Sequence, residues 1–572
     1  MTSSDQGTDA QAAAQAALKA AEEAEKAAAA ARAHAEELAR RAADPEAPET
    51  DADAAQARQE AEHSEVVATV TAGYAFEGPA LAIGALVDGE AVPSAQVRIP
   101  LAMLNRHGLV AGATGTGKTK TLQVLAEQVA AAGVPVFAAD IKGDLSGIAV
   151  PGEASEKLTA RCESIGQEWT PTATATEFFS LGGLGSGVPI RASVESFGPT
   201  LLSKVLGLNE TQESSLALVF HYAREAGHRL VDLGDLRSVL VHLTTDGKDE
   251  LKALGGLSSS TAGVILRELI AFADQGADVF FGLPEIDPAD FLRTTADGLG
   301  IVSLLEVPSV QDKPAVFSTF LMYLLSQLFA TLPEVGDADR PKLVFFFDEA
   351  HLLFKDASKD FLELVTQTVR LIRSKGVGVF FVTQTPKDVP QDVLAQLGSR
   401  VQHQLRAHTP DAAKALKATV STYPTSAYDL GEVLTQLSIG EAIVTVMNEK
   451  GAPSPVAWTR VRAPQGSMDP APADVVASAV AASPLQARYG TAENPASATE
   501  TLEAASAQAA EAERVAAEAE RIAKDKPAAA PRTSTRRTSS SSRRQSTFDK
   551  AVGEASRTLA RELVKNLFKR RR

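Results

Sequence analysis

The stretch Leu109–Thr121, LVAGATGTGKTKT, constrains the fold more than any other part of the sequence. Within it, Gly112–Thr119 matches the pattern G-x-x-x-x-G-K-[ST] at every position. A short apolar run, His107–Ala111, precedes the glycines, and a helical pattern over Thr119–Ala132 follows them. Glycine lets backbone N–H groups turn inward toward an anion at the start of a helix. The sequence therefore predicts a strand, a phosphate-binding loop and a helix.

This loop supplies the predicted nucleotide-binding residues. Lys118 is expected to reach the β- and γ-phosphates, and the Thr119 hydroxyl to ligate Mg²⁺. ATP and Mg²⁺ are therefore the predicted cofactors. The full predicted binding set is Gly112, Ala113, Thr114, Gly115, Thr116, Gly117, Lys118 and Thr119.

A second motif follows about 230 residues later, where the apolar run Lys342–Phe347 ends in Asp348 and Glu349. In an ATPase the first carboxylate holds the Mg²⁺ shell and the second polarises the attacking water. An apolar strand capped by acidic residues is the alternative interpretation. The preceding phosphate-binding loop favours the ATPase, with Asp348 as the metal ligand and Glu349 as the catalytic carboxylate.

Polar residues after two other predicted strands are further candidates. Asp140 and Lys142 follow the strand Val134–Asp140, and they either face the ligand crevice or cap their own loop. Gln384 follows the strand Gly376–Thr383, where its amide is placed to sense the γ-phosphate or hold the lytic water.

Two arginines near the end of the predicted helix Phe361–Ser374 are candidates for action on a neighbouring subunit. Arg373 directly precedes a strand, and in an oligomer it can offer its guanidinium to a neighbour's nucleotide. A cation that favours the carboxyl end of a helix is the other interpretation. Arg370 competes with Arg373 for the first role.

The sequence predicts an α/β fold with a mostly parallel sheet and a mainly helical insertion at about residues 150–300. In the insertion, Lys204, Arg237 and Arg267 either face DNA or lie on solvated helix faces. The predicted elements there are a strand at Pro189–Ala192 and helices at Thr200–Leu208, Gln212–Ala226, Asp235–Leu243 and Ala262–Asp274.

The remaining elements complete this core. A small β segment precedes the loop, and a hairpin closes the domain. The predicted strands are Val66–Val70, Leu81–Val87, Gln96–Ile99, Gly300–Leu305, Arg400–Arg406, Glu441–Met447 and Pro455–Val461, and a helix is predicted at Pro314–Phe329.

Composition divides the chain into residues 1–64, 65–463, 464–546 and 547–572. The first segment is alanine-rich, and its helix at Gln11–Ala43 forms either a weak coiled coil or a fraying helix. The third is a linker with a helix at Ala498–Lys524 and a Ser/Arg-rich stretch expected to be disordered. The fourth is a basic amphipathic helix, suited to lipid, nucleic acid or a partner protein, or simply solvated.

Composition also indicates in which compartment the protein works and which surfaces it can bind. Cys162 is the one cysteine, so no disulfide framework forms, which suits the cytoplasm. We see no signal peptide and no apolar run near the roughly 20 residues that span a bilayer. The formal net charge of −16 argues against nucleic acid binding over the whole surface but permits a locally basic channel.

The motif order GATGTGKT, DIKGD, LVFFFDEAH, IRSKGVGVFFVTQTP and LGSRVQHQLRAHTP resembles the HerA-like branch of the HerA/FtsK P-loop ATPases. It is most similar to the bacterial HerA-like C-terminal-domain family. The likeness covers about Val66 to Val461, with the alanine-rich start and the Ser/Arg-rich stretch outside it.

This resemblance implies a RecA-like core in a homo-oligomeric ring, commonly a hexamer, that hydrolyses ATP between subunits and translocates double-stranded DNA. It assigns Lys118 and Thr119 to the phosphate loop, Asp348 and Glu349 to the acidic box, Gln384 to the sensor and Arg373 to the trans arginine. Two other functions remain open: an ATPase that remodels proteins or works at a membrane, and an interaction protein that nucleotide switches.

Overall fold

The computed structural model describes residues 63–253, 256–306, 314–336, 338–354 and 359–524. The chain divides into two compact units, Met1–Ala505 and Ser506–Arg572. The predicted helices at Gln11–Ala43 and Thr547–Phe568 and the Ser/Arg-rich stretch lie outside the described residues.

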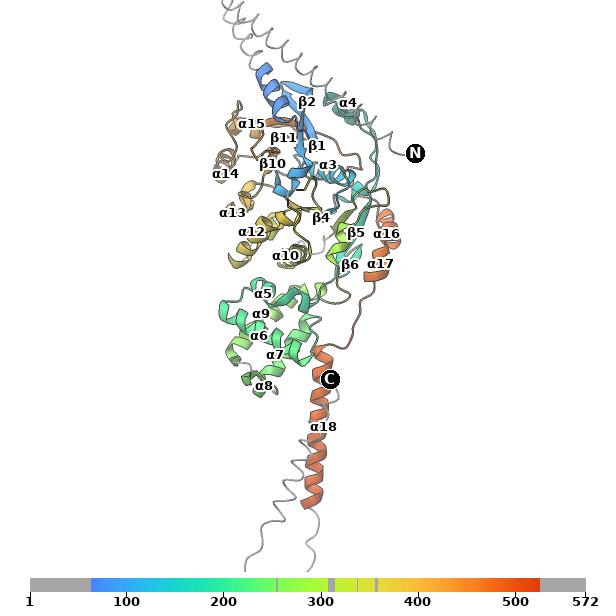
Figure 1. Ribbon diagram of the computed structural model, residues 1–572, viewed down its shortest axis with the longest axis vertical. Helices are drawn as coiled ribbons and strands as arrows, with labels where there is room; N and C mark the ends of the chain where they lie inside the picture. The colour runs from blue at the N-terminus through green and yellow to red at the C-terminus, as the bar shows by residue number, and fades with distance from the viewer. Residues whose placement is uncertain (1–62, 254–255, 307–313, 337, 355–358, 525–572) are drawn as a thin grey trace, which may run out of the picture. The chain divides into compact units, whose positions relative to one another are not determined.

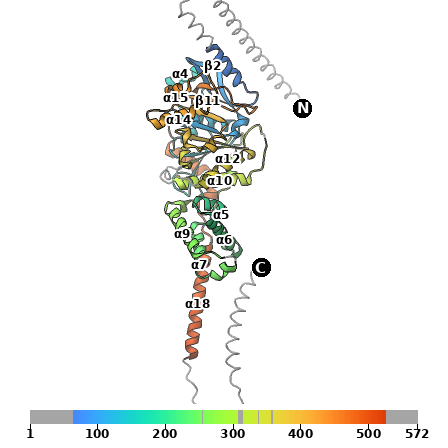
Figure 2. The same ribbon diagram turned by 90° about the vertical axis from the view of Figure 1, so that its left-hand side faces the viewer.

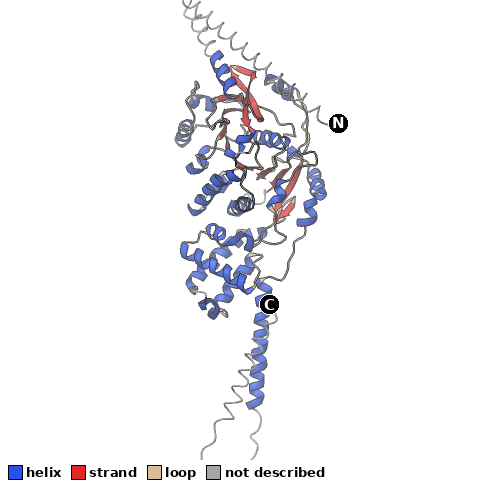
Figure 3. Ribbon diagram, viewed as in Figure 1, coloured by secondary structure: helices blue, strands red, loops and turns tan. Residues whose placement is uncertain are grey.

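Within the described residues, twelve strands form one sheet in the order β2-β1-β12-β11-β10-β3-β9-β8-β4-β7-β5-β6. The eight strands from β10 to β6 are parallel, and the four from β11 to β2 continue the sheet antiparallel. The mostly parallel α/β fold is therefore confirmed, with helices around the strands in Figure 3. The strands are β1 (Ala80–Asp88), β2 (Glu90–Pro100), β3 (Gly108–Ala111), β4 (Val136–Asp140), β5 (Thr176–Leu181), β6 (Val188–Ile190), β7 (Val302–Glu306), β8 (Leu343–Phe347), β9 (Val377–Thr383), β10 (Ser399–Gln402), β11 (Glu441–Thr445) and β12 (Ala457–Val461).

The central strands are apolar throughout because both faces of the sheet are covered. Along β8, Phe345 and Phe347 belong to one hydrophobic cluster, while Val344 and Phe346 belong to another. Successive side chains of a strand point to opposite faces. The first cluster includes α10 (Pro314–Thr331) and α12 (Lys359–Ile372), and the second includes α3 (Lys118–Ala131). These two layers fix β8 and β9 at the centre of the domain.

The insertion is helical, as predicted, and it also extends the sheet. It contributes β5, which the sequence analysis missed, and β6. A cluster of helices follows and lies next to α10 in Figures 1 and 2. Its helices are α5 (Val194–Val205), α6 (Glu210–Ala226), α7 (Leu233–Thr244), α8 (Lys248–Ala253) and α9 (Ser259–Asp274).

One predicted strand is wrong. Val66–Val70 lies inside a helix that covers residues 63–73. Val70 and Tyr74, which directly follows the helix, are both buried, and the Tyr74 N–H donates to the Val70 carbonyl oxygen at 3.0 Å. The Tyr74 hydroxyl donates to the carbonyl oxygen of Pro455 at 2.9 Å. Packing against the hairpin region therefore outweighs the local preference of the valines for a strand.

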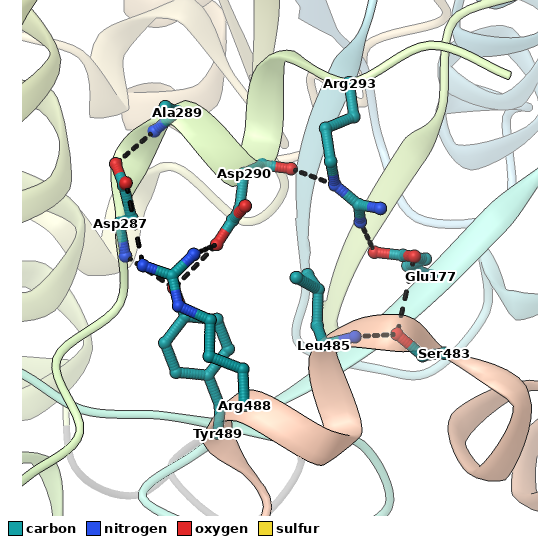
Figure 4. Close-up of polar contacts among 9 residues, drawn as sticks. All are labelled: Glu177, Asp287, Ala289, Asp290, Arg293, Ser483, Leu485, Arg488 and Tyr489. Atoms are coloured by element: carbon teal, nitrogen blue, oxygen red, sulfur yellow. Dashed lines mark hydrogen bonds and ion pairs between the residues drawn. The ribbon is translucent and has the colours of Figure 1, made fainter.

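Two helices in residues 464–505, which the sequence analysis assigned to a linker, pack on the core. Helix α16 (Ala473–Ala482) contacts β5, and α17 (Pro484–Tyr489) contacts β6. The fully buried Tyr489 donates its hydroxyl hydrogen to Asp290 Oδ2 at 2.6 Å and accepts from the Asp287 N–H at 3.1 Å (Figure 4). Arg488 pairs with the same Asp290 at 3.0 Å.

A second polar group joins this segment to the sheet. Glu177 on β5 forms an ion pair with Arg293 and accepts from the Ser483 hydroxyl at 3.4 Å (Figure 4). The chain then reaches α7, where Asp235 accepts from the Ser497 hydroxyl at 2.6 Å, just before α18 (Ala498–Lys524). This segment therefore connects the sheet with the helical insertion. Among the described residues, no helix is both long and apolar enough to span a membrane.

Candidate nucleotide site

The glycine-rich loop connects β3 to α3 as predicted. Gly112, Gly115 and Gly117 have φ values of +157°, +82° and +114°, which side chains rarely adopt. A Cβ atom at Gly112 would lie 2.5 Å from the Cβ of His403, so glycine is also required there by close packing. Gly117 ends the loop as the N-cap of α3. The loop backbone therefore turns in the way an anion cradle needs.

Lys118 folds back over this loop. Its Nζ donates to the carbonyl oxygen of Ala113 at 3.1 Å. Burial lowers the pKa of Lys118, while the nearby Glu349 and Asp348 carboxylates act in the opposite direction. Thr119 is half-buried in the first turn of α3. Among the residues that the structure describes, the hydrogen-bond partner of Lys118 is thus a loop carbonyl, which a phosphate oxygen can replace.

His403 packs against the phosphate loop and the helix that follows it. Sequence reasoning missed this residue. It follows β10, the parallel neighbour of β3, and it is fully buried. Its Nε2 lies 2.9 Å from Thr121 Oγ1, and its Nδ1 lies 2.8 Å from the carbonyl oxygen of Glu441. A backbone hydrogen bond also joins the phosphate loop to the residue before β11, since the Gly440 N–H donates to the Thr116 carbonyl oxygen at 3.0 Å. A histidine at the end of a strand was the available signal, but the strand order was needed to place it.

The acidic pair lies at the carboxyl end of β8. Asp348 Oδ1 accepts from the Glu349 N–H at 2.9 Å, whereas Oδ2 is buried and has no hydrogen-bond partner among the described residues. Burial and the adjacent Glu349 raise the pKa of Asp348 to about 7. Glu349 has a φ of +46°, a strained value for a residue with a side chain. The Ala350 N–H donates to Val382 O at 2.8 Å and so ties this turn to β9.

Asp140 and Lys142 have different roles. Asp140 is fully buried and caps its own loop, accepting from the N–H groups of Gly143 and Leu145, each at 2.8 Å. Lys142 instead extends to Glu349 and forms an ion pair with its Oε1. Burial alone would lower the pKa of Lys142, but the pair with Glu349 holds it above its ordinary value. The loop-capping interpretation therefore holds for Asp140, and Lys142 belongs to the charged cluster.

Gln384 lies at the same edge of the sheet as the phosphate loop. It is exposed and directly follows β9, which lies between β3 and β8. The Gly112 N–H donates to the carbonyl oxygen of Thr383 at 3.2 Å, so the two segments are adjacent. Its predicted contact with the γ-phosphate stays a prediction.

The candidate arginines lie away from this cluster. Arg373 begins a short 3-10 turn, Arg373–Lys375, before β9, at the amino end of the parallel strands. It is half-buried, and its charge acts on His107, which precedes β3 at that same end. Arg370 is exposed on α12. Arg373 therefore lies away from the nucleotide site of its own chain.

The three basic residues of the insertion also lie elsewhere. Lys204 pairs with Glu213 at 2.9 Å and with Asp360 at 3.1 Å, which links the insertion to α12. Arg237 and Arg267 are exposed. The structure thus gives Lys204 an internal partner and leaves Arg237 and Arg267 on solvated faces.

The residues present fit a magnesium–nucleotide complex. The unpartnered, buried Oδ2 of Asp348 is the hard oxygen ligand that Mg²⁺ prefers. No group of three or more His, Cys, Asp or Glu residues that could hold a metal occurs in the described part of the chain. A cation with few protein ligands fits Mg²⁺, which keeps waters and takes its other ligands from substrate phosphates.

The chain is similar to known proteins. The family described as "Helicase HerA-like C-terminal" matches residues 86–571. The match therefore runs through the Ser/Arg-rich stretch, farther than the expected end near Val461.

Two curated proteins named DNA double-strand break repair helicase HerA are similar to the chain. The one from Sulfolobus acidocaldarius is 21% identical over 61% of this chain and 64% of its own length. The one from Saccharolobus solfataricus is 21% identical over 65% of this chain and 67% of its own length. The chain thus spans about two thirds of each relative. A solved bacterial conjugative coupling protein, TrwB, is 16% identical with a TM-score of 0.46, over 71% of this chain and 94% of its own.

Proposed function

Because this chain belongs to the helicase HerA-like C-terminal family, we propose that it is a Mg²⁺-dependent ATPase that works as an oligomeric motor on double-stranded DNA. The observation that carries the ATPase is the convergence of Lys118, Asp348 and Glu349 at the carboxyl ends of β3 and β8. Each group has the chemistry that hydrolysis of a phosphoanhydride needs: a phosphate-binding cation, a metal ligand and a carboxylate beside the attacking water.

The reaction is in-line attack of water on the γ-phosphate. The loop N–H groups and Lys118 neutralise the phosphate charge, and Mg²⁺, when bound, neutralises the developing charge on the phosphate oxygens. Thr119 and Asp348 are the residues that would hold the Mg²⁺ shell. Glu349 orients the water and accepts its proton, and Gln384 contacts the γ-phosphate through its amide. Catalysis therefore comes mainly from positioning and charge neutralisation.

The DNA motor is supported by the names of the relatives, which are helicases. In the proposed oligomer, Arg373 acts on the nucleotide of a neighbouring subunit, because it lies at the opposite end of the strands from the nucleotide site of its own chain. A cation placed there serves a phosphate only when a second subunit brings its own nucleotide to it. Subunits in a ring meet this requirement.

The test is the steady-state ATPase rate with and without linear double-stranded DNA, at low and moderate salt, with Glu349→Gln as the blank. We expect turnover that DNA stimulates and that salt weakens, since phosphate contacts release counterions. Turnover that DNA does not affect would leave the ATPase standing and end the motor proposal. In that case we would test protein and membrane partners next, because the net charge is acidic and residues Lys569–Arg572 are basic. No turnover above the blank would contradict the ATPase itself.

A further inference from the structure

Four charged side chains converge at the candidate site, and one of them has no role in the mechanism above. Lys118 and Lys142 are the cations, and Asp348 and Glu349 are the carboxylates. Lys142 belongs to the loop after β4, which pairs with β8 in parallel, so both loops leave the same edge of the sheet. Its backbone N–H donates to Asp140 Oδ1 at 3.2 Å. This hydrogen bond therefore fixes the backbone position of Lys142.

The Lys142–Glu349 ion pair joins an accessible group to a buried one. The side chain of Lys142 is 38% exposed, whereas that of Glu349 is 7% exposed. The partly exposed Lys142 side chain therefore ends at the buried Glu349 carboxylate, where its ammonium group contacts Oε1. On the other oxygen, His351 Nδ1 lies 3.2 Å from Glu349 Oε2. Among the described residues, neither His351 Nδ1 nor Glu349 Oε2 has a hydrogen-bond partner, so it is Lys142 that occupies this carboxylate, through Oε1.

Of the two paired side chains, Lys142 can move more freely than Glu349. A lysine has a flexible stem and three rotatable donors, so it can change partner by rotating its side chain. Glu349 is fixed by a strained turn whose backbone is bonded to β9. A γ-phosphate adds more negative charge than one carboxylate and would enter beside Lys118. When a triphosphate binds, Lys142 is therefore the partner that can move.

We propose that Lys142 is a second phosphate-binding lysine, which pairs with Glu349 when the γ-phosphate is absent and transfers to it when a nucleoside triphosphate binds. The transfer frees Glu349 Oε1 to face the attacking water. A diphosphate leaves the pair in place, so Lys142 makes the site distinguish ATP from ADP. This inference rests on the proposed ATPase and names the residue that senses its substrate.

The test is a binding titration with Mg²⁺ and either ADP or an ATP analogue whose β,γ-bridge is an imido group. In Lys142→Ala, affinity for the analogue should fall about tenfold or more, as expected for the loss of a charge-assisted hydrogen bond. Affinity for ADP should stay within about twofold, well below such a loss. Lys142→Arg keeps the charge and should restore most of the preference. Lys157→Ala, an exposed lysine on α4 (Glu156–Ser164), is the matched control.

The outcomes separate the inference from the proposed function. If the wild-type protein binds both nucleotides but Lys142→Ala lowers neither affinity, or lowers both equally, Lys142 is not the sensor and the ATPase stands. If the wild-type protein binds neither nucleotide, both proposals fall. Should Lys142→Ala not fold, Lys142→Gln retains a donor for Glu349 but no charge, and the same loss of preference is required of it.

Discussion

His403 Nε2 lies 2.9 Å from Thr121 Oγ1, and this contact joins the strand beside the phosphate loop to the first turns of the helix after it. The imidazole is completely buried, and its other nitrogen lies 2.8 Å from the Glu441 carbonyl oxygen. One side chain therefore connects β10, α3 and β11 directly under the loop. The geometry of the phosphate loop depends on a residue about 280 positions away in the sequence.

The burial of His403 predicts a pH-dependent stability. Burial lowers the pKa of His403 from 6.5 to about 4. As pH falls below about 6.5, the unfolded chain takes up this proton before the folded chain does, so stability decreases toward pH 4. A pKa shift of this size corresponds to a change of about 3 kcal/mol in the free energy of unfolding.

We expect the Tm of the wild-type protein to fall more between about pH 7.5 and pH 5 than the Tm of His403→Gln. His107, whose burial also lowers its pKa to about 4, acts in both proteins and cancels. Equal falls in Tm would contradict this assignment.

Lys118→Ala should abolish nucleotide binding without unfolding the protein. In the free site this side chain makes one described hydrogen bond, to the loop carbonyl of Ala113, so its loss costs little stability. Binding of Mg·ADP measured by titration and Tm measured by thermal melting check the two parts separately. Lys157→Ala is the control. Near-normal affinity in Lys118→Ala would refute the phosphate-loop assignment.

Arg373→Ala should retain nucleotide affinity and lose turnover. The residue lies at the amino end of β9, away from the loop of its own chain. A mixture of Arg373→Ala and Lys118→Ala subunits should recover activity, because some interfaces then pair an intact phosphate loop with an intact arginine. Arg370→Ala, mixed in the same way, tests the competing residue. The absence of recovery at every mixing ratio would remove the support for a trans arginine.

Tyr489→Phe should destabilise the protein while leaving the nucleotide site unchanged. The hydroxyl bridges Asp290 Oδ2 and the Asp287 N–H, so its removal leaves the Asp287 N–H without this acceptor, while Asp290 Oδ2 keeps its ion pair with Arg488. The expected cost is about 1–3 kcal/mol. A lower Tm with unchanged Mg·ADP affinity is the expected pair of results. An unchanged Tm would show that α17 does not contribute to stability through this contact.

Local sequence patterns were sufficient for much of the core. The strand, loop and helix around Gly112–Thr119 were predicted because glycines, apolar runs and helical spacing act over a few residues. The same applies to the strand before Asp348 and to α18, whose bounds agree with the prediction. The segment at Val66–Val70 was mispredicted because its packing partners come from distant parts of the chain.

The sequence by itself determined the phosphate loop, the acidic strand end and the parallel α/β core, since each of these has a signature in consecutive residues. The order of strands in the sheet has no such signature. It decided that His403 lies beside the phosphate loop and that Lys142 pairs with Glu349 across 207 positions of sequence. These contacts arise only where parallel strands end side by side, and that adjacency is set by the packing of the whole domain.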